Sequence, residues 1–183
     1  MAALSYLDVL RLSGDVYMGG LMTVNELGLP TEFIYSEPLR PSKLQLSLYG
    51  TTLGRYLMID VVGKGLIEAS QSRGVPVVLA HDELLPLATR VKRPLCLLTQ
   101  TTQRPMGAVG EVRAREGVEG GEEFTAQLSD VQSPYSFRIY DRVNFPVDQH
   151  IKAFLDCAAH FDVLEPLNRV KRTLELLKDE KPA

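Results

Sequence analysis

The N-terminal segment constrains the fold most, because three strand-like stretches follow one another closely in it. Residues 6–12 and 31–36 alternate apolar and polar side chains, which is the pattern of a half-buried strand. Residues 16–24 are apolar but contain Gly19 and Gly20, a pair that indicates a bulge or the close approach of another backbone or a ligand. Turn-forming residues separate the three stretches. The sequence therefore predicts an antiparallel meander at this end of the chain.

Helical patterns occupy the middle and the end of the sequence. Residues 53–70 carry apolar side chains at a roughly helical period, and two further apolar stripes lie within residues 151–161 and 167–177. Short, continuous apolar runs at residues 75–80 and 95–99 are typical of buried strands. We therefore predict an α+β fold, in which an antiparallel or mixed sheet is covered by a middle helix and two C-terminal helices.

Residues 102–134 differ from the rest of the chain because glycine and glutamate are concentrated there. This composition favours an exposed hairpin with an acidic tip near residues 116–123. The chain as a whole has 183 residues, 45% hydrophobic and 23% charged, which excludes general disorder and suits one domain. We predict a single α+β domain over residues 1–183, with a mobile hairpin or loop at about 102–134 that adds little to the core.

The sequence offers no membrane, secretion or metal signal. It contains no apolar run of about 18 residues, and its N-terminus lacks the basic head and uninterrupted apolar centre of a signal peptide. We therefore expect a cytoplasmic protein whose two cysteines, Cys96 and Cys157, stay reduced in apolar surroundings. His150, Cys157 and His160 share one predicted helix, but they lack the tight, repeated spacing of a zinc site. We predict no metal and no cofactor.

The pair of residues in the sequence best suited to catalysis is His81 and Asp82, which directly follow the apolar run at residues 75–80. Catalytic groups often lie at the carboxyl ends of strands in α/β sheets, so the pair is a candidate catalytic site. Asp82 is equally suited to cap a short helix over residues 83–89, and this structural role is the interpretation that we favour.

The segment over residues 38–56 is a candidate binding surface. It connects the meander to the middle helix, and it is rich in arginine and tyrosine, the residue types that most often anchor a partner. The residues that we predict to bind are Arg40, Lys43, Tyr49, Arg55 and Tyr56.

These observations favour an interaction protein over an enzyme, although the sequence leaves catalysis open. The net charge of −3 gives the chain no general attraction for polyanions. Our main hypothesis is a non-enzymatic, self-associating interaction protein or complex subunit, with a protein partner, no membrane contact and no nucleic acid. The alternative is a small hydrolase or transferase that uses His81 and Asp82. A second alternative is a nucleic-acid accessory factor that binds through Arg90, Lys92 and Arg93.

Overall fold

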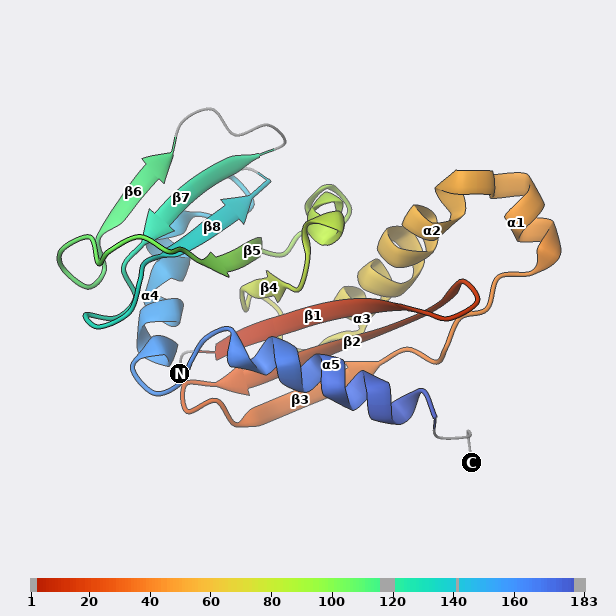
Figure 1. Cartoon of the computed structure of the whole chain (residues 1–183), viewed down its shortest axis with the longest axis horizontal. Coiled ribbons are helices and arrows are strands. Elements are labelled where there is room, and N and C mark those ends of the chain that lie inside the picture. The colour runs from red at the N-terminus through yellow and green to blue at the C-terminus, as the bar shows by residue number, and fades with distance from the viewer. Residues whose placement is uncertain (1–2, 116–120, 141, 180–183) are drawn as a thin grey trace.

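A mixed, eight-stranded sheet forms the centre of the molecule (Figure 1), and its strand order is β3-β2-β1-β4-β5-β8-β7-β6. The computed structural model describes residues 3–115, 121–140 and 142–179. The strands are β1 (Ala3–Leu12), β2 (Val16–Asn25), β3 (Pro30–Tyr35), β4 (Val77–Leu79), β5 (Leu95–Gln100), β6 (Val112–Arg115), β7 (Glu122–Ala126) and β8 (Tyr135–Ile139). The predicted meander is confirmed, since β1 pairs with β2 and β2 with β3, both antiparallel. β1, β4 and β5 run parallel to one another.

Helical segments cover both faces of the sheet, as the α+β prediction requires. Most of the predicted middle helix is present as α2 (Leu53–Tyr56), the π-helical segment η2 (Leu57–Gly63) and α3 (Lys64–Ala69). The two predicted C-terminal helices are α4 (Val147–Ala158) and α5 (Glu165–Leu177). The remaining segments are α1 (Lys43–Tyr49) and the 3₁₀ turns η1 (Gly50–Thr52) and η3 (Asp82–Thr89).

Neighbouring residues of β1 belong to different cores, because side chains alternate across a strand. Leu7 and Val9 pack with the residues of α2, η2, α3 and η3. Leu4 and Tyr6 point the other way and pack with α4 and α5. Asp8 continues this second series, so its carboxyl group lies on the face that α5 covers, where it is almost fully buried. The alternation thus places a buried acid in the middle of the sheet.

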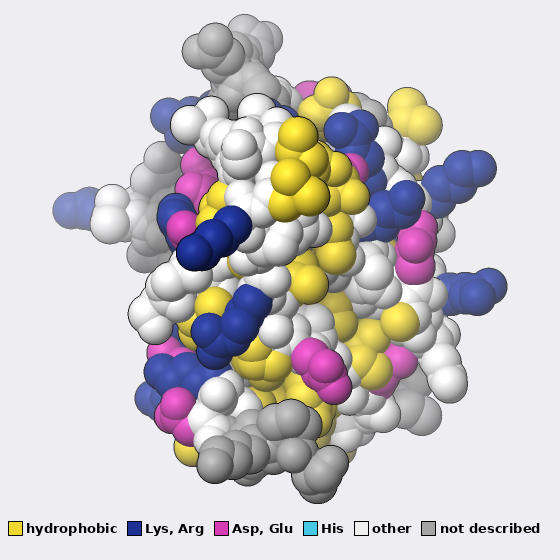
Figure 2. All heavy atoms as spheres, turned by 90° about the vertical axis from the view of Figure 1, so that its right-hand side faces the viewer, with side chains coloured by type: hydrophobic (Ala, Val, Ile, Leu, Met, Phe, Trp, Pro, Cys, Tyr) yellow, Lys and Arg dark blue, Asp and Glu magenta, His cyan; other side chains and the backbone are white. Residues whose placement is uncertain are grey.

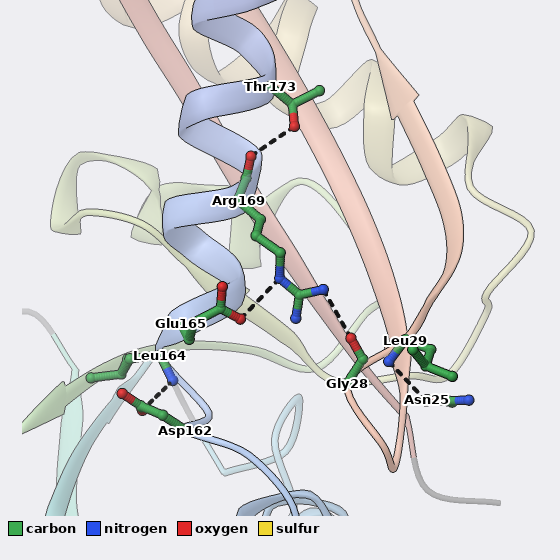
Figure 3. Close-up of polar contacts among 8 residues, drawn as sticks. All are labelled: Asn25, Gly28, Leu29, Asp162, Leu164, Glu165, Arg169 and Thr173. Atoms are coloured by element: carbon green, nitrogen blue, oxygen red, sulfur yellow. Dashed lines mark hydrogen bonds and ion pairs between the residues drawn. The ribbon is translucent and has the colours of Figure 1, made fainter.

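One hydrogen bond connects helix α5 to the turn between β2 and β3, and its donor Arg169 is held by a second residue of the helix (Figure 3). The Arg169 guanidinium donates through Nη1 to the Gly28 carbonyl oxygen at 2.9 Å, and through Nε to the Glu165 carboxylate at 2.9 Å. Each of these bonds has a charged donor and is therefore stronger than a neutral hydrogen bond. The anchored helix holds Lys171, two residues further on, over the same face of the sheet as Asp8.

The predicted acidic hairpin exists, but it belongs to the sheet rather than standing apart from it. β6 pairs with β7, and β7 pairs with β8, which continues the sheet to its edge. Phe124, Ala126 and Leu128 are buried in the main core, so the expectation that this region adds little packing is wrong. Part of the predicted acidic tip, residues 116–120, lies outside the described residues.

The glycine pair in β2 marks a close approach of side chains, not of the backbone or ligand that the sequence suggested. A Cβ atom on Gly19 would lie 2.5 Å from Val62 Cγ1 and 2.8 Å from Leu66 Cδ1. Replacing Gly19 by Ala should therefore lower the free energy of unfolding by about 1–3 kcal/mol, which urea denaturation would measure. Gly65→Ala is the matched control, because a Cβ there meets nothing within 4 Å. It should raise stability by about 0.5–1 kcal/mol, and equal shifts for both variants would contradict this account.

Candidate functional site

A cavity of about 1200 Å³ opens at the carboxyl ends of the parallel strands β1, β4 and β5. This edge is where ligands bind in open α/β sheets. The segment from η1 to η2 forms one wall of the cavity, and α5 forms another. The charged or titratable side chains that line it are Asp8, Arg11, Tyr17, Arg55, His81, Asp82, Glu83 and Lys171.

Asp8 and His81 meet inside this cavity, although 73 positions separate them in the sequence. His81 Nε2 lies 3.6 Å from Asp8 Oδ1 and 3.3 Å from the Val9 carbonyl oxygen. A carbonyl oxygen only accepts hydrogen bonds, so the contact with Val9 favours the tautomer with the proton on Nε2. In a neutral ring Nδ1 is then the acceptor, and the His81 side chain is 34% exposed. The pair therefore joins a buried carboxyl group to an accessible base.

The environment of Asp8 perturbs its protonation. Burial raises the pKa of the Asp8 carboxyl above its ordinary value, and His81 partly opposes the rise. Lys171 on α5 opposes it further. A desolvated carboxyl group with a specific partner in a cavity is the typical setting of acid–base chemistry in proteins.

Asp82 does not cap the short helix, which corrects the role that we favoured from the sequence. The turn η3 begins at Asp82 itself, His81 occupies the N-cap position, and no side chain makes a capping hydrogen bond there. Both His81 and Asp82 line the cavity. The structure thus removes the capping role of Asp82.

Two cations in the cavity are available to a negatively charged ligand. Arg55 lies on α2 and Lys171 on α5, and neither forms an ion pair with a carboxylate within residues 3–115, 121–140 and 142–179. Arg11, by contrast, pairs with Asp15 four residues further on. Arg55 and Lys171 are therefore the candidate anion-binding groups.

The structure divides the predicted binding residues into two groups. Arg55 lines the cavity with His81 and Asp82, and thus belongs to the candidate site. The other four residues are outside the cavity lining, and all of them are exposed: Arg40, Lys43, Tyr49 and Tyr56.

Sequence reasoning missed Asp8 and Lys171. Asp8 is the only acid of β1, a signal that was visible in the sequence but was treated as part of the strand pattern. Lys171 was visible as one member of a basic cluster with Arg169 and Arg172, which was interpreted as a solvated helix face.

Other candidates from the sequence have structural roles. Of the three basic residues in the second alternative, Arg93 is buried and donates to the carbonyl oxygens of Ser72 and Val75, which gives it a structural role. Arg90 pairs with Asp60 at 2.9 Å, and Lys92 is exposed. Cys157 is buried, and both cysteines are free thiols. Across the described ranges, no group of three or more His, Cys, Asp and Glu side chains is placed to hold a metal ion. No described helix is long and apolar enough to cross a membrane.

Comparison with solved structures identifies a shared fold. The chain resembles the crystal structure of endonuclease V from Streptomyces avermitilis with a TM-score of 0.59 and 13% identity, over 97% of this chain and 81% of that one. The crystal structure of the catalytic domain of human endonuclease V matches with a TM-score of 0.47 and 11% identity, over 97% and 82%. No protein-family model matches the sequence, and no curated protein matches it.

The shared fold corrects our main hypothesis. The chain was interpreted as a non-enzymatic, self-associating interaction protein, and this is wrong, because its fold is that of a solved nuclease. The expectation that nucleic acid is not a partner is wrong for the same reason. The comparison agrees better with the alternative hypothesis of a small hydrolase or transferase. It does not test the assignment of that activity to His81 and Asp82.

Proposed function

We propose that this chain hydrolyses phosphodiester bonds of nucleic acid, with Asp8 and His81 as its acid–base pair. The observation that carries the proposal is their convergence, 3.6 Å apart, in one cavity that Arg55 and Lys171 also line. Neither of these cations pairs with a carboxylate in the described part of the chain. The choice of nucleic acid is supported by the solved structure of the same fold, which is named an endonuclease.

In the proposed mechanism His81 transfers the proton, because the contact of its Nε2 with the Val9 carbonyl oxygen leaves Nδ1 as the acceptor. Nδ1 takes a proton from a water molecule in the cavity, and the oxygen of that water forms a bond to phosphorus. The bond from phosphorus to one ester oxygen breaks, and its electron pair leaves with that oxygen, which takes a proton from solvent water. The Asp8 carboxylate stabilises the imidazolium that forms on His81, because it lies 3.6 Å from Nε2.

The two unpaired cations act on the charge that develops during the reaction. Arg55 on α2 and Lys171 on α5 both line the cavity, so that both are available to a phosphate bound there. Preorganised positive groups lower the barrier most where water is excluded.

The test of this proposal is cleavage of labelled single-stranded and duplex oligonucleotides, with and without added divalent cations. His81→Ala should slow cleavage by about 10²- to 10⁴-fold, because the general base is lost, while the melting temperature stays nearly unchanged. His160→Ala is the matched control, because His160 lies on the surface outside the cavity lining, and it should leave the rate unaltered. Equal rates for His81→Ala and wild type, or no cleavage by wild type under any condition, would overturn the proposal.

A further inference from the structure

Two exposed tyrosines form an aromatic pair on the arm that α1, η1 and α2 build (residues 43–56). The ring centroids of Tyr49 and Tyr56 lie 5.2 Å apart, with 22° between the ring planes, so that the rings stack. Tyr49 is 42% exposed and Tyr56 40% exposed, although each ring covers one face of the other. A large part of each side chain is therefore accessible to solvent, and the mutual stacking fixes the orientation of the rings.

The arm carries positive charge without any compensating acid. Between Glu37 and Asp60 the sequence contains Arg40, Lys43 and Arg55 but no aspartate or glutamate. All three cations are exposed, and within the described parts of the chain none of them forms an ion pair. This local charge is the opposite of the net charge of −3 of the whole chain. The arm is thus complementary to an anion.

The aromatic pair adjoins the candidate active site along the chain. Thr51, Gly54 and Arg55 lie between Tyr49 and Tyr56 in the sequence. All three line the cavity that contains Asp8 and His81. In Figure 1 the arm extends away from the body of the molecule, with α1 at its outer end. Figure 2 views this end of the molecule and shows hydrophobic side chains gathered there, with Lys and Arg side chains on both sides. A ligand on the tyrosines would therefore continue into the cavity.

The helix at the tip of the arm has no buried residue, and Leu44 and Leu48 are 68% and 71% exposed. A protein partner would account for these leucines. It would not account for the stacked rings, the unpaired cations and the continuity with the cavity taken together. An unpaired nucleotide strand accounts for those three features, because it combines flat bases with regularly spaced phosphates.

We propose that Tyr49 and Tyr56 form a base-stacking subsite for an unpaired nucleic-acid strand, with Arg40 and Lys43 on its phosphates. This inference rests on the proposed function and specifies its substrate class. In a duplex the faces of the bases are covered by their neighbours, whereas an unpaired base offers its face to a ring. The subsite therefore selects single-stranded over double-stranded substrate and leads the strand towards Asp8 and His81.

The test measures binding separately from cleavage, by fluorescence anisotropy of a labelled oligonucleotide with the wild-type chain and with His81→Ala. The double variant Tyr49→Ala, Tyr56→Ala should bind a single strand about 5- to 150-fold more weakly, because aromatic stacking on the bases is lost. Tyr49→Phe with Tyr56→Phe should keep wild-type affinity, since the rings remain. Tyr140→Ala is the matched control, because Tyr140 is 44% exposed and lies at the end of β8, outside the cavity lining.

The salt dependence of binding tests the cations. Lys43→Ala should reduce the slope of log affinity against log salt by about 0.7 for a single strand, because one phosphate contact is lost. Arg104→Ala removes an equal charge from an exposed residue beyond the arm, and it should leave the slope unchanged.

Each remaining result has a defined meaning. Wild-type affinity in the double Ala variant, or tighter binding of duplex than of single strand, would overturn the subsite. A wild-type dimer that the double Ala variant converts to monomer in sedimentation would assign the tyrosines to a second copy instead, and would also overturn it. If binding follows the expectation but no substrate is cleaved, the subsite stands and the proposed hydrolysis fails. If the wild-type chain cleaves nucleic acid but the double Ala variant binds a single strand with wild-type affinity, the subsite is overturned and the proposed hydrolysis stands.

Discussion

Replacing Asp8 by Asn should lower the rate of nucleic-acid hydrolysis by about 10²- to 10⁴-fold and should also make the folded chain more stable. The rate falls because the carboxylate that stabilises protonated His81, 3.6 Å away, is gone. Stability rises because a nearly buried charge is replaced by a neutral amide of similar size. A residue that is kept at a cost to stability is expected at a functional site rather than in an ordinary core position.

The pH dependence of stability gives this prediction a second, independent readout. Burial raises the pKa of Asp8 in the folded chain above its value in the unfolded chain. At a pH below both pKa values the Asp8 carboxyl group is neutral in the folded and in the unfolded chain, and it does not lower the free energy of unfolding. As the pH rises through the two values, the unfolded chain ionises first and the folded state loses relative stability. The advantage of Asp8→Asn over wild type should therefore grow with pH through this window and stay constant above the folded-state pKa.

Urea denaturation at several pH values, together with cleavage rates, would measure both effects. Asp130→Asn is the matched control for the rate, because it makes the same chemical change at an exposed residue outside the cavity. A variant Asp8→Asn that is slower and also less stable than wild type would show that Asp8 supports the structure instead.

The elements were predictable because their signals are local. Alternation marked β1 and β3, and the helical period marked α4 and α5, each within one short stretch of sequence. The order of the strands depends on pairings between distant segments, such as Ser5 with Val77, and no local pattern contains that information. The sequence therefore predicted the fold class but not the strand order.

For the same reason, the sequence pointed to one residue of the candidate pair, His81, but not to the other, Asp8. His81 was noticed because it follows a buried strand directly, and that is a local signal. Its partner Asp8 lies inside β1, and only the parallel pairing of β1 with β4 brings the two side chains together. Which acid belongs to which base thus follows from the topology of the sheet.

The acidic hairpin shows how composition can mislead. Charge and glycine in residues 102–134 suggested a solvated loop. However, Glu123 is almost buried, and it accepts hydrogen bonds from Ser136 Oγ at 2.7 Å and Arg115 Nη1 at 3.0 Å. These donors, together with Arg138 at 3.9 Å, lower the pKa of the Glu123 carboxyl, with the Ser136 hydrogen bond as the main cause. The charge that indicated solvent is thus compensated within the sheet.

Replacing Phe124 by Ala should lower the free energy of unfolding by about 3–5 kcal/mol, and this loss tests whether the hairpin belongs to the core. The Phe124 ring is 2% exposed and stacks on Phe137 with 4.8 Å between centroids, so its removal would leave a cavity beside α4. Val109→Ala, in the same region but 51% exposed, is the matched control and should change stability by less than about 0.5 kcal/mol. Urea denaturation would measure both variants. A loss below about 1 kcal/mol for Phe124→Ala would mean that β7 contributes little packing, as the composition of residues 102–134 alone had suggested.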